Sequence, residues 1–332
     1  MKKNFFFNLN FQKTINFFKI FISYYFSKLI KKPFIFGEAF SLSIEPCNFC
    51  NLQCLECPTG KKELTRKIGE INFNFYKKII DENMKNLIFL FLYFQGEPYL
   101  SKNFFKLISY ANKQNIYTKT STNGHFLDEK NIRKTILSGL DELIISVDGT
   151  NQKSYESYRK GGNFNKLLDS IKNFTSLKKK LKSKKPYIII QFLVLRSNEN
   201  EISDMKNLFK ILNADKLEFK TAQFYNFKNG NPLIPINNKF SRYKIGKNGK
   251  YFIKNKLKNH CWRSWSSAVI TWDFWVLPCC FDKNAEHKMG NLKEKSLKKI
   301  WNGKLYKNFR KKIFISRKNI YICKNCNEGL KI

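Results

Sequence analysis

Four cysteines lie close together in the first fifth of the chain, within the stretch EPCNFCNLQCLECPTG. They are Cys47, Cys50, Cys54 and Cys57, and their thiols could form disulfides, bind zinc or bind an iron–sulfur cluster. Thiolates are ligands for both kinds of metal site. The chemistry of this stretch therefore depends on the spacing of the thiols and on the rest of the chain.

The N-terminal sequence argues against disulfides. It begins MKKNFFFNLNFQKTINFF, with lysines before apolar residues as in a signal peptide, but polar residues interrupt the apolar region and no small-residue cleavage site follows. We therefore expect a cytoplasmic protein, in which thiols are kept reduced. The odd total of nine cysteines agrees with this expectation. We also expect no membrane-spanning helix, because the sequence has no uninterrupted apolar run of about 18 residues.

The spacing of the thiols separates zinc from an iron–sulfur cluster. Two CxxC pairs that bind one zinc ion are usually separated by about twelve or more residues, whereas here the second pair follows the first almost directly. Compact cysteine runs that end in Cys-Pro bind clusters in ferredoxins, and Pro58 follows Cys57. The spacing therefore favours a cluster over a zinc ion.

An alternation of strand and helix patterns begins just before the cysteine stretch and continues after it. The apolar runs LIFLFLYF and YIIIQFLVL are nearly continuous, as in strands buried on both faces of a parallel sheet. Helical patterns separate the strands, at about 73–85, 101–114, 127–138, 163–183 and 199–212. Repeated βα units imply a parallel sheet and suggest an open or partial barrel. The six predicted strands are Leu42–Glu45, Leu87–Phe94, Ile116–Thr122, Leu143–Val147, Tyr187–Leu195 and Lys216–Thr221.

The first four predicted strands each end in residues that could take part in chemistry. After the cysteine stretch come QGEP at 95–98, STNG at 121–124 and SVDG at 146–149. Turn formation alone could explain any one of these motifs. In barrels built from parallel strands, however, active residues lie at the C-terminal ends of the strands. Four such motifs in order therefore predict one shared site.

Cys50-x3-Cys54-x2-Cys57, followed by these motifs in this order, resembles the radical S-adenosylmethionine (SAM) superfamily over residues 40–221. QGEP is similar to the family's GGEP motif, with Gln95 replacing the first glycine. EPCNFCNLQCLECP is similar to its EPTNxCNLxCxxCP opening, with Cys47 in place of threonine, so we expect Cys47 to be a bystander. The resemblance implies an α/β fold, a partial (β/α)6 TIM-like barrel, in which three thiolates hold a 4Fe–4S cluster with one iron open to SAM.

The same resemblance implies which residues bind SAM. Gln95, Gly96 and Glu97 would meet its methionine amine. Arg159 would pair with its carboxylate, for which a bidentate guanidinium is well suited. Ser121 and Asn123 match positions that hydrogen-bond SAM. Ser146 and Asp148 match positions that face its ribose, and Gln191 matches a position near its adenine. For Ser121, Asn123 and Gln191, strand-end packing or capping is the alternative.

The last third of the chain contains the other five cysteines. The spacing of Cys261, Cys279, Cys323 and Cys326 resembles the SPASM/twitch extension, whose landmarks LPCCFD, GNL and IWNG also occur. The resemblance implies an auxiliary 4Fe–4S cluster bound by those four thiols, with Cys280 left over or replacing Cys279. A zinc site is the alternative. The predicted organisation is an N-terminal helical segment at 1–39, a barrel at 40–221 and a small iron–sulfur domain at 222–332.

The function that the resemblance implies is that of a radical SAM oxidoreductase. Cleavage of SAM would yield a 5′-deoxyadenosyl radical that oxidises a small molecule such as a sugar or amino sugar, and the auxiliary cluster would transfer an electron. A peptide-modifying maturase is the alternative. Asp282, just after the cysteine pair Cys279–Cys280, is the candidate general base, with a solvated loop carboxylate as the alternative. A ferredoxin or flavodoxin would supply electrons.

The formal charge of +37 favours anionic partners. The lysines are spread along the chain, however, and a basic zinc protein that binds nucleic acid would explain neither the cysteine stretch nor the ordered motifs. We therefore expect no nucleic-acid partner. A simple electron carrier is a third class, but it would not need a barrel of this size.

A helix is predicted over residues 11–31. Its apolar residues recur at helical spacing, at Phe11, Ile15, Phe18, Ile22, Tyr25 and Leu29. We expect this stripe to pack on the domain that follows. The alternative is a basic amphipathic helix that lies on a membrane surface.

Overall fold

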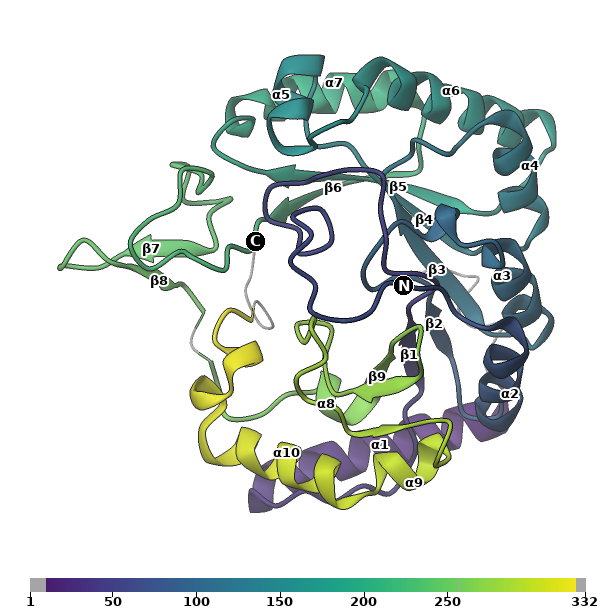
Figure 1. Ribbon diagram of the computed structural model, residues 1–332, viewed down its shortest axis with the longest axis vertical. Helices are drawn as coiled ribbons and strands as arrows, with labels where there is room; N and C mark the ends of the chain where they lie inside the picture. Colours follow the sequence, from purple (N-terminus) through teal and green to yellow (C-terminus); the bar gives the residue numbers. More distant parts are fainter. Residues whose placement is uncertain (1–9, 256, 327–332) are drawn as a thin grey trace. The chain divides into compact units, whose positions relative to one another are not determined.

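The computed structural model describes residues 10–255 and 257–326. They fall into two compact units (Figure 1). Residues 10–49, 64–120 and 257–326 form unit 1, and residues 50–63 and 121–255 form unit 2. The cysteine stretch is therefore divided at Cys50, where the chain leaves unit 1.

Unit 1 is built on a mixed sheet with the strand order β11-β10-β9-β1-β2-β3. Strand β1 pairs in parallel with β2 and with β9, while β10 pairs antiparallel with β9 and β11. Leu42 of β1 lies opposite Leu90 and Ala268, and all three are buried. The strands are β1 (Ser41–Ile44), β2 (Phe89–Phe91), β3 (Tyr117–Thr122), β9 (Ser267–Ile270), β10 (Trp275–Leu277) and β11 (Gly290–Asn291).

The helices of unit 1 come from both ends of the chain. They are α1 (Phe11–Ile30), α2 (Phe73–Asn83), α3 (Phe104–Lys113), α8 (Arg263–Ser266), α9 (Leu297–Trp301) and α10 (Lys304–Ser316), with short turns η2 (Pro98–Leu100), η4 (Arg317–Asn319) and η5 (Tyr321–Cys323). Figure 1 shows α1 beside α10, and both contribute to one apolar cluster that contains Ile20, Tyr24, Trp265 and Phe314. The N-terminal helix and the C-terminal helix thus share one apolar core.

Helix α1 forms as predicted, but it packs through the opposite face. Asn10 caps its first turn by accepting a hydrogen bond from the Lys13 N–H. The apolar stripe that we expected to pack on the domain is exposed, and that expectation is wrong. The buried face is mostly polar and consists of Lys13, Asn16, Ile20, Ser23, Tyr24 and Ser27. This polar face can be buried because each of its polar side chains has a hydrogen-bond partner.

Unit 2 contains the parallel strands β4 (Glu142–Ser146), β5 (Tyr187–Val194) and β6 (Lys216–Thr221). Figure 1 shows helices along one side of these strands. They are α4 (Glu129–Leu137), α6 (Phe164–Lys180) and α7 (Ile202–Leu212), the last preceded by the turn η3 (Glu199–Glu201). Helix α5 (Gln152–Tyr158) precedes α6, and a hairpin of β7 (Tyr243–Ile245) and β8 (Tyr251–Ile253) follows β6.

All six predicted strands occur, and so do the five predicted helices between them. Strand β2 is shorter than its apolar run, since only Phe89–Phe91 has strand geometry. Helix α5 was not predicted, because its sequence QKSYESY has too few apolar residues for a clear helical period. The domain boundaries at 39 and 221 stay predictions.

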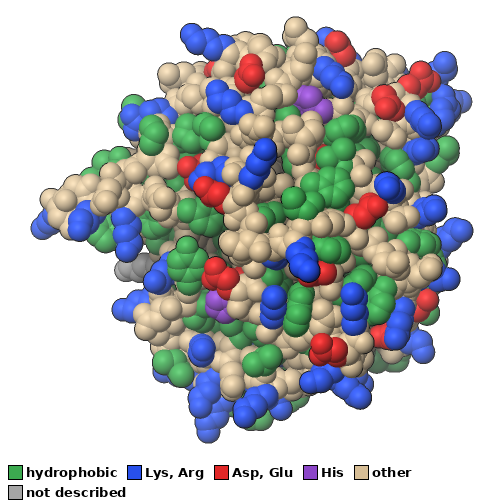
Figure 2. Space-filling view, in the orientation of Figure 1, with side chains coloured by type: hydrophobic (Ala, Val, Ile, Leu, Met, Phe, Trp, Pro, Cys, Tyr) green, Lys and Arg blue, Asp and Glu red, His purple; other side chains and the backbone are tan. Residues whose placement is uncertain are grey.

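Figure 2 shows Lys and Arg side chains scattered over the visible face, without one dominant basic patch. Within the ranges described above, no helix has the length and apolar character needed to span a bilayer.

Candidate functional site

The three motif cysteines lie in the loop of unit 2 that follows β1. Cys54 is buried with Leu52 and Tyr158 in an apolar cluster, and Cys50 and Cys57 pack at its edge. The loop is fixed by backbone hydrogen bonds to the end of α5. Gln53 N donates to the Lys160 carbonyl oxygen at 3.0 Å, and Leu55 N donates to the Tyr158 carbonyl oxygen at 3.3 Å. The fold therefore holds the three thiols on one short anchored loop.

Two polar side chains reach the thiols of this loop. Arg159 Nη1 lies 3.8 Å from Cys54 Sγ, and Asn123 Nδ2 lies 3.8 Å from Cys50 Sγ and 2.8 Å from Asn51 Oδ1. Burial raises the pKa of the Cys54 thiol, and the Arg159 guanidinium acts in the opposite direction. Arg159 is therefore placed to balance the charge of a thiolate.

The predicted ribose ligand Asp148 is used within the protein. Its Oδ2 accepts a hydrogen bond from Arg159 Nε at 2.6 Å, and its Oδ1 accepts one from Leu193 N at 2.7 Å. Only 1 % of the Asp148 side chain is exposed. This charge-assisted pair fixes the direction of the guanidinium. The structure thus shows Asp148 as the residue that orients Arg159, and its role toward a ribose stays a prediction.

Ser121, Asn123 and Ser146 lie at or just after the C-terminal ends of their strands, whereas Gln191 lies within β5. Ser146, the last residue of β4, is opposite Gln191 of β5. Ser121 lies near the end of β3, and Asn123 follows that strand. Asn123 Oδ1 also accepts a hydrogen bond from His125 N at 3.0 Å, so part of its bonding capacity shapes its own turn.

The QGEP turn belongs to unit 1 and is hydrogen-bonded to the segment that follows β1. Glu97 N donates to the Phe49 carbonyl oxygen at 2.9 Å, and the Glu97 carboxylate accepts from Tyr99 N at 3.2 Å. Gln95 Nε2 donates to the Phe94 carbonyl oxygen at 2.9 Å. Phe49 immediately precedes Cys50, so the turn is tied to the residue at which the cysteine loop begins.

Cys47 differs from the three motif cysteines. Its Sγ donates to the Glu97 carbonyl oxygen at 3.2 Å, and burial raises the pKa of its thiol to about 12. The Cys47 thiol is thus used in a hydrogen bond to the backbone of the QGEP turn. The expectation that it is a bystander stays a prediction.

Gly96 is required by the close approach of two backbone segments. Its φ is +77°, and an added Cβ would lie 2.6 Å from the Cys47 carbonyl oxygen and 2.8 Å from that of Phe49. Backbone atoms cannot move aside as a side chain end can. We expect Gly96→Ala to lower the free energy of unfolding by more than the roughly 1–2 kcal/mol of a left-handed alanine alone.

The matched control for this change is Gly161→Ala. Gly161 has a φ of +78° but no atom within 4 Å of its added Cβ, so it should show the left-handed penalty without a clash. Urea unfolding of both variants measures the difference between them. Equal losses would show that the approach of the backbone at Gly96 has no energetic cost.

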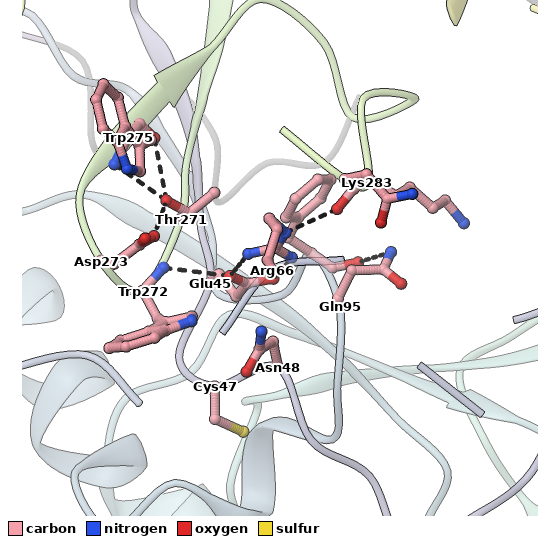
Figure 3. A network of polar contacts seen from close by, with 12 residues as sticks. Glu45, Cys47, Asn48, Arg66, Gln95, Thr271, Trp272, Asp273, Trp275 and Lys283 are labelled. Atoms are coloured by element: carbon pink, nitrogen blue, oxygen red, sulfur yellow. Dashed lines mark hydrogen bonds and ion pairs between the residues drawn. The ribbon is translucent and has the colours of Figure 1, made fainter. Parts of the chain in front are cut away.

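A buried ion pair lies beside this turn and was not predicted from the sequence (Figure 3). Arg66 binds both carboxylate oxygens of Glu45, at 2.8 and 2.7 Å, and its Nε donates to the Lys283 carbonyl oxygen at 2.8 Å. Trp272 N donates to Glu45 Oε2 at 3.2 Å. Residues just before the cysteine loop are thus bonded to residues just after Cys279 and Cys280. A glutamate directly at the end of a buried strand was the one available signal.

Arginines accompany the C-terminal cysteines. Arg317 Nη2 donates to Cys326 Sγ at 3.0 Å, and Arg263 Nη1 donates to Cys280 Sγ at 3.3 Å. Cys326 N donates to the Cys323 carbonyl oxygen at 3.1 Å, which closes the turn between these two cysteines.

Cys279 lies next to a second thiol as well as to Cys261. The adjacent Cys280 thiol and burial raise the pKa of Cys279, and the Cys261 charge acts in the same direction. Cys261, Cys279 and Cys326 and the extra thiol of Cys280 are buried or half-buried. Cys261 and Cys279 have thiol neighbours, and Cys280 and Cys326 have arginine neighbours. The choice between Cys279 and Cys280 as ligand stays open to test.

Asp282, the candidate general base, is hydrogen-bonded to the backbone of its own loop. Its two carboxylate oxygens accept hydrogen bonds from Glu286 N and His287 N, both at 2.9 Å, and the residue is buried. These contacts stabilise the loop after Cys279 and Cys280. Because Asp282 is buried, the solvated carboxylate that we gave as the alternative is not found, and its role as a general base stays a prediction.

The described residues contain no group of three or more His, Cys, Asp or Glu side chains placed to bind one metal ion between them. An iron–sulfur cluster requires a different arrangement, because each thiolate binds its own iron. The donor set fits that requirement, with three thiols on one anchored loop in unit 2 and five C-terminal thiols in unit 1, of which Cys280 and Cys326 are bonded to arginines.

Comparison with known proteins gives the family. Residues 44–209, half of the chain, match the family model described as radical SAM superfamily, and residues 261–327 match the SPASM model, described as an iron–sulfur cluster-binding domain. The "Tungsten-containing aldehyde ferredoxin oxidoreductase cofactor-modifying protein" of Pyrococcus furiosus is 24% identical over 319 residues, which cover 86% of each chain.

Two solved structures show the same fold. BtrN in complex with AdoMet and 2-DOIA has a TM-score of 0.54 at 21% identity, and the match covers 87% of this chain and 93% of that chain. Streptococcus suis SuiB bound to S-adenosylmethionine has a TM-score of 0.62 at 14% identity, with coverage of 86% and 70%. The α/β partial barrel with an appended iron–sulfur domain is therefore confirmed. The chain belongs to the radical SAM superfamily, with a SPASM domain, and its cofactors are SAM, the 4Fe–4S cluster that binds it and auxiliary iron–sulfur centres.

Proposed function

We propose that this radical SAM enzyme is an oxidoreductase that oxidises a small molecule, such as a sugar or amino sugar. The observation that carries the proposal is the match to BtrN, which covers 93% of that chain, whereas the match to SuiB covers 70% of its chain. BtrN was solved with AdoMet and 2-DOIA. The extent of the fold thus resembles that of BtrN more than that of the larger protein.

The number of cysteines supports the same proposal. Three belong to the SAM motif and we expect Cys47 to be a bystander, which leaves five of the nine. A fully ligated 4Fe–4S cluster takes four, so five provide for one auxiliary cluster. With all its irons ligated, that cluster suits electron transfer, and we propose a ferredoxin or flavodoxin as the external electron donor.

The cofactors supply the radical chemistry, in which reductive cleavage of SAM yields a 5′-deoxyadenosyl radical that abstracts hydrogen from substrate. The residues of the chain bind and orient. We propose that Arg159, held by Asp148, binds the SAM carboxylate, and that the turn at Gln95–Glu97 receives its amine. Ser121, Asn123 and Ser146 at the strand ends, and Gln191 within β5, would make the remaining SAM contacts.

Deuterium transfer tests this proposal. The reconstituted enzyme is incubated anaerobically with SAM, dithionite and a panel of deuterated sugars, amino sugars and short peptides, and 5′-deoxyadenosine is analysed by mass spectrometry. We expect deuterium in 5′-deoxyadenosine from a sugar or amino sugar. Transfer from peptides alone would refute the small-molecule proposal while leaving the radical SAM chemistry intact.

A peptide-modifying maturase is the second candidate. It is favoured by the match to PqqA peptide cyclase of Gluconobacter oxydans, at 25% identity over 197 residues, which cover 59% of this chain and 53% of that protein. That match covers a smaller part of both chains than the match to BtrN does.

The arginine at Cys326 gives a prediction for the auxiliary cluster. A hydrogen bond from a guanidinium stabilises the more negative, reduced state, so its loss lowers the reduction potential. We expect Arg317→Gln to lower the potential of the auxiliary cluster by tens of millivolts, where about 59 mV corresponds to a tenfold change in a one-electron equilibrium. Lys318→Gln removes the same charge from the exposed neighbouring residue and should change the potential much less. Redox titration followed by electron paramagnetic resonance measures both, and equal shifts would contradict a role for the Arg317–Cys326 bond.

A further inference from the structure

The outer side of α1 is an exposed apolar surface. We define the α1 aromatic face as Phe11, Ile15, Phe18, Ile22, Tyr25, Phe26 and Leu29, together with Phe34 and Phe36 of the following loop, and all nine are exposed. Phe11 and Leu29, almost the whole helix apart, are 83% and 80% exposed. Phe26 contacts the Phe34 ring with centroids 5.4 Å apart, so helix and loop form one surface. Exposed apolar patches of this kind mark interaction sites.

Specific polar contacts prevent the helix from turning this face inward. Lys13 Nζ donates to the Asn115 carbonyl oxygen at 2.7 Å. Asn16 exchanges two hydrogen bonds of 2.9 Å with the Glu38 backbone. Ser27 Oγ does the same with Phe34, at 3.0 and 2.8 Å. Rolling the helix would leave these buried polar groups without partners, which is costly. The outward direction of the aromatic face is therefore a built feature of unit 1.

Positive charge borders the same face. With 3.6 residues per turn, Lys19 and Lys28 fall at its two edges, and Lys31 and Lys32 follow at the end of the helix, all exposed. The sequence has no acidic residue before Glu38. Lysines at the edges of an apolar face can extend their charged ends toward lipid headgroups while their stems stay on the apolar side.

We propose that the α1 aromatic face docks on an anionic membrane surface, with the helix lying in the plane of the interface. A helix with an aromatic face and lysines beside it has the composition of interfacial helices, and each lysine near an anionic leaflet adds attraction. A second copy of this chain is a poorer occupant, because its face carries the same positive border. The docking does not depend on which substrate the enzyme oxidises.

Vesicle flotation tests the docking. The full-length, cluster-loaded protein is mixed anaerobically with vesicles of phosphatidylcholine containing 30% phosphatidylglycerol, or of phosphatidylcholine alone. We expect flotation with the anionic vesicles and at least a tenfold lower partition coefficient for Phe18→Glu/Ile22→Glu. The control variant is Leu137→Glu/Ile211→Glu, which places two glutamates at exposed apolar positions of α4 and α7 and should float like the wild type.

Two further measurements keep the test decisive. Lys19→Gln/Lys28→Gln should weaken binding to anionic vesicles and leave the folding of α1 intact by circular dichroism, because both lysines are exposed. Sedimentation velocity without lipid detects self-association. The proposal is overturned if the wild type does not float, if Phe18→Glu/Ile22→Glu floats equally well, or if that variant only dissociates a dimer.

Discussion

We expect the Cys54→Ala variant to form no detectable 5′-deoxyadenosine from SAM and dithionite. Cys54 is the buried thiol of the anchored loop, and Arg159 Nη1 points toward it. Loss of an outer-shell partner alone typically lowers metal affinity or activity by about 10–100-fold, so loss of a ligand should exceed that range. Anaerobic reconstitution followed by chromatography of 5′-deoxyadenosine measures it.

The control is Cys47→Ala, which removes a thiol three positions before the first motif cysteine. Because the Cys47 thiol is buried and donates to the Glu97 carbonyl oxygen, we expect this variant to keep its SAM-cleaving cluster and most of its activity. A Cys47→Ala variant as inactive as Cys54→Ala would mean that Cys47 is a ligand after all. An active Cys54→Ala variant would contradict the assignment of Cys50, Cys54 and Cys57 as the cluster ligands.

The largest expected effect on stability comes from the Glu45–Arg66 pair. Arg66→Met leaves the fully buried Glu45 carboxylate without its bidentate partner. Breaking a buried pair from one side typically costs about 3–5 kcal/mol. Glu63→Gln breaks the exposed Lys61–Glu63 pair, whose atoms are 2.7 Å apart, and exposed pairs contribute at most about 1 kcal/mol. Urea unfolding of the two variants should therefore give clearly different midpoints.

The same variant should respond to pH with a definite sign. Burial raises the pKa of the Glu45 carboxyl, while Arg66 and the Trp272 N–H lower it. Without Arg66 the folded-state pKa rises further above the unfolded value, so the folded state favours the protonated acid. Arg66→Met should then be less destabilised at pH 5 than at pH 8, since stability falls as pH rises through the raised pKa. An identical loss at both values would show that Glu45 does not bear the uncompensated charge.

Removing both partners separates the pair from its surroundings. In Glu45→Leu/Arg66→Met no buried charge remains, and replacement of a buried pair by apolar residues is often neutral. We expect this double variant to be more stable than Arg66→Met alone. A loss equal to the sum of the single losses would indicate that the two side chains are not coupled.

The parts of the fold that were predictable are those with a local signal. Continuous apolar runs gave the strands, and Cys50, Cys54 and Cys57 lie within eight residues, so their common loop follows from the chain itself. The Glu45–Arg66 pair joins residues 21 positions apart, and no periodicity in the sequence connects them. The hydrogen bond from Arg66 to the Lys283 carbonyl oxygen, more than two hundred residues further on, is a tertiary contact of the same kind.

Helix α1 shows the opposite limit. The period of its apolar residues was correct, and so was its extent, yet the side that packs was predicted wrongly. Periodicity identifies a face but not its partner, and here Lys13, Asn16 and Ser27 find backbone groups that compensate for their burial. Asp148 also has contacts that its motif did not indicate, because its oxygens accept hydrogen bonds from Arg159 and Leu193, while its role toward a ribose stays a prediction.

The buried side of α1 also covers the chain beside a predicted ligand of the auxiliary cluster. Ile20 and Tyr24 cover Trp265 and Phe314, and the Tyr24 hydroxyl bonds His260 Nδ1 at 2.8 Å, one residue before Cys261. Removing α1 would therefore expose Trp265 and Phe314 to solvent and would release His260, the neighbour of Cys261. An N-terminal truncation that leaves the barrel strands intact would thus still alter the surroundings of a predicted cluster ligand.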